Sequence, residues 1–154
     1  MLLSLFVTAA FAGKLAAGLF GIPWTAAPIV TPMEHCTEES NGWVCATTVA
    51  DVPVDVFCMA EYGALYAVSV QVNGIAQCET VRRAYDAAWG DATPSSPYRT
   101  AWTEDATWRD DGVSAAWTFN RYPGKCSIMA LHMNNYEQVQ KAKKDAARST
   151  AEGL

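Results

Sequence analysis

Cysteines are the residues of this sequence with the clearest chemistry. There are five of them, and no two stand in a CxxC spacing. Without that spacing, neither a thioredoxin-like redox site nor a zinc ribbon is indicated. Disulfides persist in oxidising compartments, so we interpret the cysteines as disulfide partners, with one thiol left over from the odd number. The candidates are Cys36, Cys45, Cys58, Cys78 and Cys126.

Two pairing schemes follow from the expected strands. If residues 50–53 form a hairpin turn, Cys45 lies opposite Cys58 on the neighbouring strand. Alternatively, Cys36 and Cys45 close a short acidic loop, and Cys78 on a helix reaches a strand that carries Cys126. A native disulfide typically stabilises a protein by about 2–4 kcal/mol. The sequence leaves both schemes open.

Metal chemistry has a weaker signal. His35 precedes Cys36, and His132 lies near Met129 and Met133, so that both places combine ligand types suited to copper. On a strand, however, His132 and Met133 point to opposite faces, and methionines beside aliphatic residues usually fill a core. We therefore predict neither a metal site nor a cofactor.

Acid–base chemistry would need carboxylates in a shared pocket. The adjacent acidic pairs at 38–39, 104–105 and 110–111 are instead typical of turns, loops and breaks in strands. No GxSxG, P-loop or HExxH motif occurs. We predict no catalytic residue. If the protein were an enzyme, its first candidates would be Glu61, Arg99, Arg109 and Asp110.

Aromatic side chains support one binding hypothesis. Trp102, Trp108 and Trp117 lie in the expected strands of the second half of the chain. If these side chains are exposed, they form a contact surface for a carbohydrate, a peptide or a protein. The competing interpretation is that they fill the space between a sheet and its helices.

Hydrophobic periodicity predicts the elements that position these residues. Alternating apolar residues predict strands over 43–49, 54–60 and 64–72, and a spacing of three and four residues predicts a helix over 75–89. Strands over 98–109, 113–119 and 126–133 follow a Pro- and Ser-rich loop, and a helix capped by Asn134 or Asn135 runs to about Arg148. The predicted class is α+β, with an antiparallel sheet in two three-stranded sets. Each set is followed by a helix (βββα-βββα), and both helices pack on one sheet face.

The first twelve residues, MLLSLFVTAAFA, have the apolar core and small-residue cleavage site of a secretory signal, although no Lys or Arg precedes them. We predict a signal peptide over residues 1–12, with cleavage as late as residue 17, and a single globular domain over 13–154. The apolar run is shorter than the roughly twenty residues that a membrane span needs, so no stable span is expected in the mature chain. The predicted compartment is periplasmic or extracellular.

Charge is unevenly distributed along the chain. The net charge of −5 argues against nucleic-acid binding, which needs a basic face. Residues 30–111 hold thirteen acidic residues against four arginines, whereas residues 112–154 hold six basic residues against three acidic ones. An acidic solvated surface with a basic terminal helix explains this pattern. The alternative is a basic helix that docks on an acidic partner or an anionic lipid.

Short stretches of the chain resemble a group of exported bacterial proteins of unknown function, which open with an aromatic-Gly-Ile-Pro-aromatic motif. The matching residues are Phe20-Gly21-Ile22-Pro23-Trp24, Tyr85 with Trp89-Gly90, and Trp108 with residues 113–119. The resemblance spans about residues 19–133. It departs at Thr25, where such proteins tend to carry Gly, in the late position of Pro94, and in the cysteines. It implies an exported, non-catalytic domain and transfers no functional residue.

These patterns together predict a non-catalytic, disulfide-stabilised binding domain whose partner is an unknown protein or small ligand. The alternative is a secreted inhibitor that blocks a partner enzyme through its aromatic strand face or through the acidic loop at 34–42. A small exported enzyme comes third.

Overall fold

The computed structural model describes residues 15–19, 22–24, 36–94 and 103–152. The chain opens with a short 3-10 helix, η1 (Leu15–Ala17), and a two-stranded sheet of β1 (Gly18–Leu19) and β2 (Ile22–Pro23). The remaining elements form the body of the fold. They are β3 (Cys36–Glu39), β4 (Gly42–Val49), β5 (Val52–Glu61), β6 (Ala64–Asn73), α1 (Ile75–Trp89), β7 (Thr93–Pro94), β8 (Thr103–Asp110), β9 (Val113–Asn120), β10 (Lys125–His132) and α2 (Met133–Glu152).

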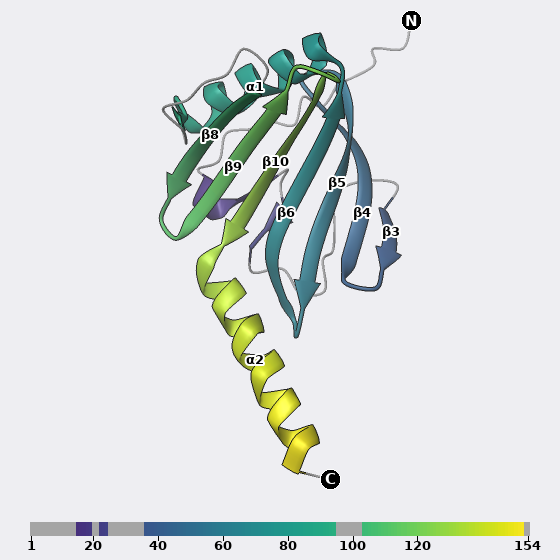
Figure 1. Ribbon diagram of the computed structural model, residues 1–154, viewed down its shortest axis with the longest axis vertical. Helices are drawn as coiled ribbons and strands as arrows, with labels where there is room; N and C mark the ends of the chain where they lie inside the picture. Colours follow the sequence, from purple (N-terminus) through teal and green to yellow (C-terminus); the bar gives the residue numbers. More distant parts are fainter. Residues whose placement is uncertain (1–14, 20–21, 25–35, 95–102, 153–154) are drawn as a thin grey trace, which may run out of the picture.

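Eight of these strands form one antiparallel sheet, in the order β3-β4-β5-β6-β10-β9-β8-β7 (Figure 1). The predicted α+β class is consistent with this fold, but the prediction of two separate three-stranded sets is wrong. Strands β6 and β10 pair along their length, from Asn73 opposite Lys125 to Ala67 opposite Leu131. This pairing joins the two halves of the chain into a single sheet, so that neither β6 nor β10 is an edge strand.

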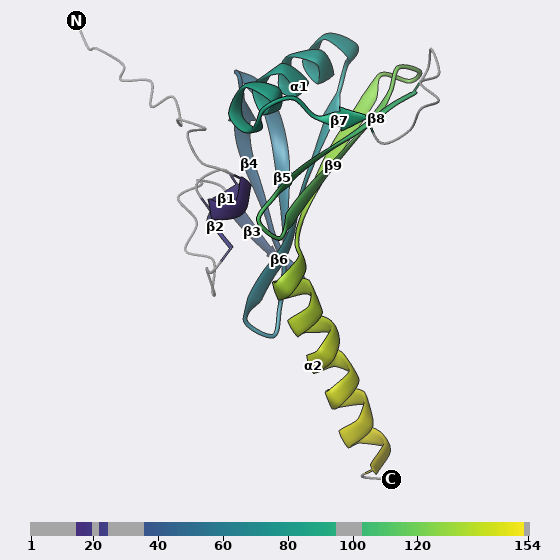
Figure 2. The same ribbon diagram turned by 90° about the vertical axis from the view of Figure 1, so that its left-hand side faces the viewer.

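One face of the sheet carries the core, because inward residues alternate along each strand. Figure 2 shows α1 on this side, together with β1 and β2. The helix contributes its buried face through Cys78, Val81 and Tyr85. These side chains recur at three- and four-residue spacing, as expected for a helix that lies on a sheet. The largest fully buried side chains of the described residues include Trp117, Tyr85, Leu15, Leu65 and Ile128.

The prediction that both helices pack on one sheet face is also wrong. Helix α2 continues directly from β10 and projects past the sheet (Figures 1 and 2). Its buried contacts with the body come from its first half: Val139 is buried, and the Tyr136 ring lies 6.0 Å from the Tyr66 ring of β6. Every residue from Lys143 to Ala151 is exposed. The second half of α2 is polar all round and has no apolar stripe wide enough to bury.

The start of α2 also differs from the expected cap. The helix begins at Met133, and Nδ1 of His132 accepts a hydrogen bond of 3.3 Å from the backbone N–H of Asn135. His132 therefore takes the capping role that the sequence assigned to Asn134 or Asn135. The ring of the partly buried His132 also lies 5.6 Å from the ring of the buried Trp24.

The register of the hairpin between β4 and β5 excludes one of the two disulfide schemes. Its turn consists of Ala50 and Asp51, both with positive φ, as in a two-residue primed turn. The expected turn was four residues long. The shorter turn shifts the register so that Cys45 lies opposite Val56, while Trp43 lies opposite Cys58. The Cys45–Cys58 pairing is therefore wrong.

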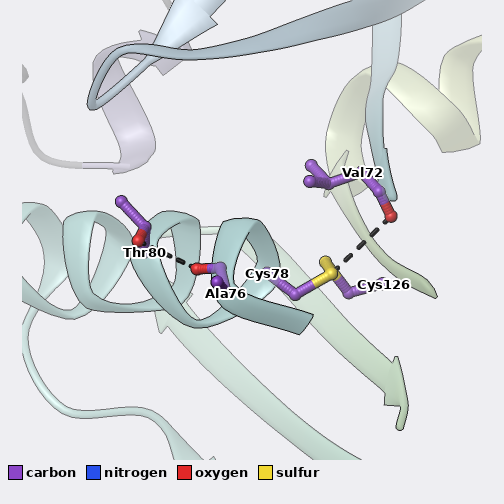
Figure 3. Close-up of a disulfide and its surroundings, with 5 residues drawn as sticks. All are labelled: Val72, Ala76, Cys78, Thr80 and Cys126. Atoms are coloured by element: carbon purple, nitrogen blue, oxygen red, sulfur yellow. Dashed lines mark hydrogen bonds between the residues drawn. A yellow bond between two sulfur atoms is a disulfide. The ribbon is translucent and has the colours of Figure 1, made fainter. Parts of the chain in front are cut away.

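The second scheme is confirmed. Cys36 and Cys45 are directly opposite on β3 and β4 and form one disulfide, and Cys78 of α1 is bonded to Cys126 of β10. Figure 3 shows the second disulfide at the start of α1, where Sγ of Cys78 lies 3.6 Å from the carbonyl oxygen of Val72. The Cys78–Cys126 disulfide thus attaches α1 to the middle of the sheet. Cys58 is a free, buried thiol.

Candidate functional site

The tryptophans predicted to bind a ligand are core residues where the structure describes them. Trp108 is 4% exposed and Trp117 is 1% exposed, and Trp102 lies outside the described residues. Tyr85 and Trp89 of α1 complete the cluster: their rings stack at 4.6 Å, and Trp89 meets Trp108 edge-on at 5.5 Å. The Nε1–H of Trp108 donates to the carbonyl oxygen of Gly90 at 2.8 Å. Trp108 and Trp117 therefore form no exposed aromatic surface.

A charged layer lies against this aromatic cluster. Arg82, one turn before Tyr85 on α1, places its guanidinium 5.0 Å from the centre of the Trp108 ring and 6.0 Å from that of Trp117. Its Nη1 lies 2.6 Å from a carboxylate oxygen of Glu104, and its Nε lies 3.0 Å from Asp86. A guanidinium with two carboxylate partners and an aromatic face beneath it is firmly held.

A second arginine reaches the same carboxylate from the turn after β9. Nη2 of Arg121 lies 4.0 Å from Glu104, and its Nη1 lies 3.3 Å from Glu79 on α1. The Arg121 guanidinium also lies 5.0 Å from the centre of the Phe119 ring. Glu104 thus connects one guanidinium of the helix with another at the end of the sheet.

A cavity of about 170 Å³ opens between α1 and the ends of β8 and β9. We call it the α1–β9 cavity. Its walls combine three guanidinium groups, two carboxylates and two aromatic rings. The lining residues are Glu79, Arg82, Arg83, Glu104, Trp117, Phe119 and Arg121.

Two exposed apolar side chains stand near these residues in the chain. Ile75 is 47% exposed and precedes Glu79 by one helical turn, and Tyr122 is 84% exposed and directly follows Arg121. The two segments are joined by a hydrogen bond from the backbone N–H of Gly74 to the carbonyl oxygen of Gly124, at 2.7 Å. Exposed aromatic and arginine side chains around a hollow are typical of a binding site.

Two buried donors of the aromatic cluster lack acceptors. Among the described residues, neither the hydroxyl of Tyr85 nor the indole Nε1 of Trp117 has a hydrogen-bond partner. Burial raises the pKa of the Tyr85 hydroxyl far above its ordinary value. Because Trp117 also lines the α1–β9 cavity, the resonance of its indole N–H is expected to shift when a ligand binds in the cavity.

The residues proposed for an enzyme lie elsewhere. Glu61 pairs with Lys143 at 2.9 Å and accepts a hydrogen bond from Tyr66, which together attach α2 to the β5–β6 hairpin. A carboxylate oxygen of Asp110 accepts the backbone N–H of Ala16 at 3.0 Å. Arg109 is exposed, and Arg99 lies outside the described residues. None of the three described candidates lines the α1–β9 cavity.

Metal-binding clusters and membrane-spanning helices are both absent from the described ranges. There, no three His, Cys, Asp or Glu side chains gather in a way that would hold a metal ion. His35, one half of the copper hypothesis, is outside these ranges. In the same part of the chain, no helix has both the length and the apolar character required to cross a bilayer.

Sequence reasoning missed the charged residues of the cavity. The spacing of Arg82 and Asp86 is a recognisable helix-surface pair, but it is equally common on solvated helices. The sequence pattern favours a break in the strand at Glu104, whereas Glu104 lies within β8, opposite Phe119. That register points Glu104 toward α1, where Arg82 neutralises it. Only the crossing of α1 over β8 and β9 brings these residues together.

The chain matches no protein-family model, no curated protein and no solved structure. The resemblance to exported bacterial proteins therefore stays a prediction.

Proposed function

We propose that this protein is an exported, disulfide-stabilised binding domain without a catalytic role, and that the α1–β9 cavity is its ligand site. The cavity carries the proposal. Two of its arginines, Arg82 and Arg121, lie against aromatic rings and beside carboxylates, which limits the movement of their guanidinium groups. A concave site that presents a few polar groups is a place where a small ligand can bind.

Two features support export to the periplasm or the extracellular space. Disulfides such as Cys36–Cys45 and Cys78–Cys126 persist in oxidising compartments. The apolar leader over residues 1–12 fits a secretory signal. Cleavage after Ala12 would retain Leu15, which is 1% exposed and belongs to the core, whereas cleavage after Ala17 would remove it. We therefore favour the earlier site.

Intact mass of the exported protein tests the compartment. Loss of residues 1–12, together with one thiol that is alkylatable in denaturant before reduction and five after it, is the expected result. An uncleaved chain with five free thiols would contradict export.

A nuclear magnetic resonance screen tests the binding site. A mixed collection of acidic, basic and neutral single-ring compounds is added to the oxidised, ¹⁵N-labelled protein. Saturable shifts are expected at the Nε–H groups of Arg82 and Arg121 and at the indole N–H of Trp117, all of which line the cavity. The indole N–H of Trp43, on β4, is the internal control. Shifts confined to Trp43, or no shifts at all, would contradict a ligand site in the cavity.

One specific observation supports the inhibitor hypothesis. The Cys36–Cys45 disulfide braces the β3–β4 hairpin, and Thr37, Glu38 and Glu39 of this hairpin are exposed. A disulfide-braced hairpin with exposed glutamates suits the active site of an enzyme that binds acidic polypeptide chains. Assays of secreted proteases with the protein and with its Glu38→Gln/Glu39→Gln variant test this function. Equal inhibition by both proteins, or none by either, would exclude the hairpin as an inhibitory loop.

A further inference from the structure

We propose that two copies of this protein pair face to face through the side of the sheet that lies away from α1, with Arg109 of each copy opposite Glu39 of the other. This side carries Phe57, Met129 and their neighbours in register, and we call it the open face. Figure 2 shows α1, β1 and β2 on the other side of the sheet. The inference is independent of the α1–β9 cavity, because that cavity lies between α1 and the sheet.

The alternation of side chains along the central strands defines the open face. Val56 of β5, Val70 of β6 and Ile128 of β10 are partners in register, and all three belong to the core. The residues next to them in sequence therefore point to the open face. An antiparallel sheet with one face on its core usually carries polar side chains on the other face. Two adjacent rows of the open face depart from that pattern.

Both rows run across the same five strands, in the order β4-β5-β6-β10-β9. The first row contains Val44, Phe57, Ser69, Met129 and Ala116. The second row contains Gly42, Met59, Ala67, Leu131 and Ser114. The side chain of Met129 is 47% exposed, and the other large side chains of the two rows are partly exposed. A contiguous apolar patch in the middle of a sheet face indicates an interaction surface.

Opposite charges lie at the two ends of the second row. On β3, Glu39 is the register partner of Gly42, and on β8, Arg109 is the register partner of Ser114. Both charged side chains are exposed, and neither has an ion-pair partner in the described part of the chain. Each lies three strands away from β6, which places both about 14 Å from Ala67 in the middle of the row.

This spacing makes the open face complementary to itself. A two-fold axis that runs along β6, between two facing sheets, exchanges strands at equal distances on either side of β6. Arg109 of each copy then lies opposite Glu39 of the other, and the contact occurs twice. A second copy of the chain therefore supplies the opposite charge that each end of the row lacks.

The same axis places apolar side chains against apolar side chains. Phe57 and Met59 of β5 face Met129 and Leu131 of the partner's β10, since β5 and β10 flank β6. At the axis itself, β6 contributes a small residue to each row, Ala67 to the second. The flexible methionine side chains can fill the space above these small residues.

The other charged residues of the open face do not oppose this arrangement. Asp55 lies in the next row, where the axis places it opposite the partner's Ser127. Lys125 lies one row further and faces the partner's Pro53. Asp105 lies on β8, and no described residue of the partner is opposite it. Within these rows, no two like charges meet across the interface.

The dimensions of the open face indicate a dimer of modest affinity. The second row, from Glu39 to Arg109, crosses the strands from β3 to β8 and is about 29 Å long. Its apolar part is confined to the central strands and is two rows deep. Interfaces at the small end of the stable class dissociate readily, so we expect a Kd of about 1–100 µM.

Sedimentation equilibrium of the oxidised protein between about 1 µM and 1 mM measures this Kd. Met129→Asp puts an unpaired charge in the middle of the interface and is expected to weaken the dimer by about tenfold or more. Ile75→Asp is the matched control, because Ile75 is also 47% exposed but belongs to α1, on the other side of the sheet. It is expected to leave the Kd unchanged. Circular dichroism checks that each variant is folded.

Charge reversal tests the pairing of the two ends. Arg109→Glu places two glutamates opposite each other, and Glu39→Arg places two arginines opposite each other. Each variant alone is expected to dimerise about fivefold or more weakly. A mixture of the two variants restores both contacts with the signs exchanged, so native mass spectrometry is expected to show more heterodimer than a statistical mixture contains. The double variant Glu39→Arg/Arg109→Glu is expected to dimerise as the wild type does.

Two further variants make the same charge changes away from the open face. Glu38→Arg changes the residue next to Glu39, whose register partner Trp43 packs against the core. Arg83→Glu changes an exposed residue of α1. Both variants are expected to dimerise as the wild type does.

Three results would overturn the proposal. A monomer over the whole concentration range would exclude a second copy as the partner of the open face. A dimer that Met129→Asp leaves intact would place the interface elsewhere on the protein. A statistical mixture of the two charge-reversed chains would contradict the two-fold axis along β6. None of these results bears on ligand binding in the α1–β9 cavity, which lies on the other side of the sheet.

Discussion

The side-chain amide of Asn135 donates a hydrogen bond of 2.7 Å to the carbonyl oxygen of Leu65. The same nitrogen donates to the carbonyl oxygen of Trp24 at 2.9 Å. One residue in the first turn of α2 therefore joins a strand of the large sheet to the N-terminal segment. These two bonds connect parts of the chain that lie 70 and 111 residues away from Asn135.

The first prediction concerns this junction. Asn135→Ala removes both donors and leaves two carbonyl oxygens without a partner, so the free energy of unfolding is expected to fall by about 1–3 kcal/mol. Asn134→Ala, at the exposed neighbouring position, is the control and is expected to change stability by less than about 0.5 kcal/mol. Urea denaturation measures both. Equal effects of the two substitutions would show that the Asn135 amide does not hold the junction.

The two disulfides are expected to contribute unequally. Cys78 and Cys126 are 48 residues apart in the sequence, and Cys36 and Cys45 are 9 apart. The longer loop restricts the unfolded chain more, so loss of Cys78–Cys126 is expected to cost about 4 kcal/mol and loss of Cys36–Cys45 about 3 kcal/mol. Denaturation of the Cys78→Ala/Cys126→Ala and Cys36→Ala/Cys45→Ala variants measures these costs. The opposite order would mean that loop length does not dominate here.

A third prediction concerns Gly42, where β4 approaches its antiparallel neighbour β5 closely. A Cβ at this position would overlap the backbone carbonyl oxygen of Cys58, and φ of Gly42 is +144°. Gly42→Ala is therefore expected to destabilise the protein by about 3 kcal/mol. Gly63→Ala is the matched control: its φ is +74°, but no atom lies within 4 Å of the added Cβ, so a cost of about 1 kcal/mol is expected. Thermal or urea unfolding that ranks Gly63→Ala as the more damaging change would contradict this account.

The free thiol of Cys58 predicts a dependence of stability on pH. Burial raises the pKa of this thiol from 9.0 to about 11. The unfolded chain loses the thiol proton at a lower pH than the folded chain does. The resulting stabilisation is complete below about pH 9 and is lost as the pH rises through the folded pKa.

The expected size is up to roughly 2–3 kcal/mol, since one pKa unit corresponds to about 1.4 kcal/mol. Between pH 8 and pH 11, the free energy of unfolding of the wild type should fall by this amount more than that of Cys58→Ala. The comparison cancels the ionisation of Tyr85, which both proteins share. Parallel pH profiles would show that the thiol does not ionise differently in the two states.

Local patterns predicted the elements well because their causes lie within a few residues. Alternation in β9 and the Asp111-Gly112 turn predicted the β8–β9 hairpin, and both turn residues have positive φ. The change from two-residue to three- and four-residue spacing after Gly74 predicted the start of α1. The Cys78–Cys126 disulfide was foreseen as one of two schemes for the same reason, since it needs only a helix that lies on its own sheet.

Long-range relationships were not predictable in this way. Nothing in β6 or β10 alone indicates that they pair, because any apolar, alternating strand can accept either neighbour. The β4–β5 register was missed because Ala50 and Asp51 adopt positive φ without a glycine. The candidate site was missed because Arg82, Glu104 and Arg121 are ordinary surface types until α1 crosses the sheet. Trp108 and Trp117, by contrast, lie in the core, as the competing interpretation of these tryptophans predicted.

The pairing of β6 with β10 also has a kinetic consequence. Strands β3 to β6, and likewise β8 to β10, are joined by hairpins that close over a few residues, whereas Val72 must meet Cys126 across 54 positions of the chain. Contacts so distant in sequence form slowly, because the chain must first lose the entropy of the intervening loop. We therefore expect Cys36–Cys45 to form before Cys78–Cys126 when the reduced protein refolds, as timed alkylation of the remaining thiols would report. The pairing of β6 with β10 is then the last step of folding, and formation of the Cys78–Cys126 disulfide marks its completion.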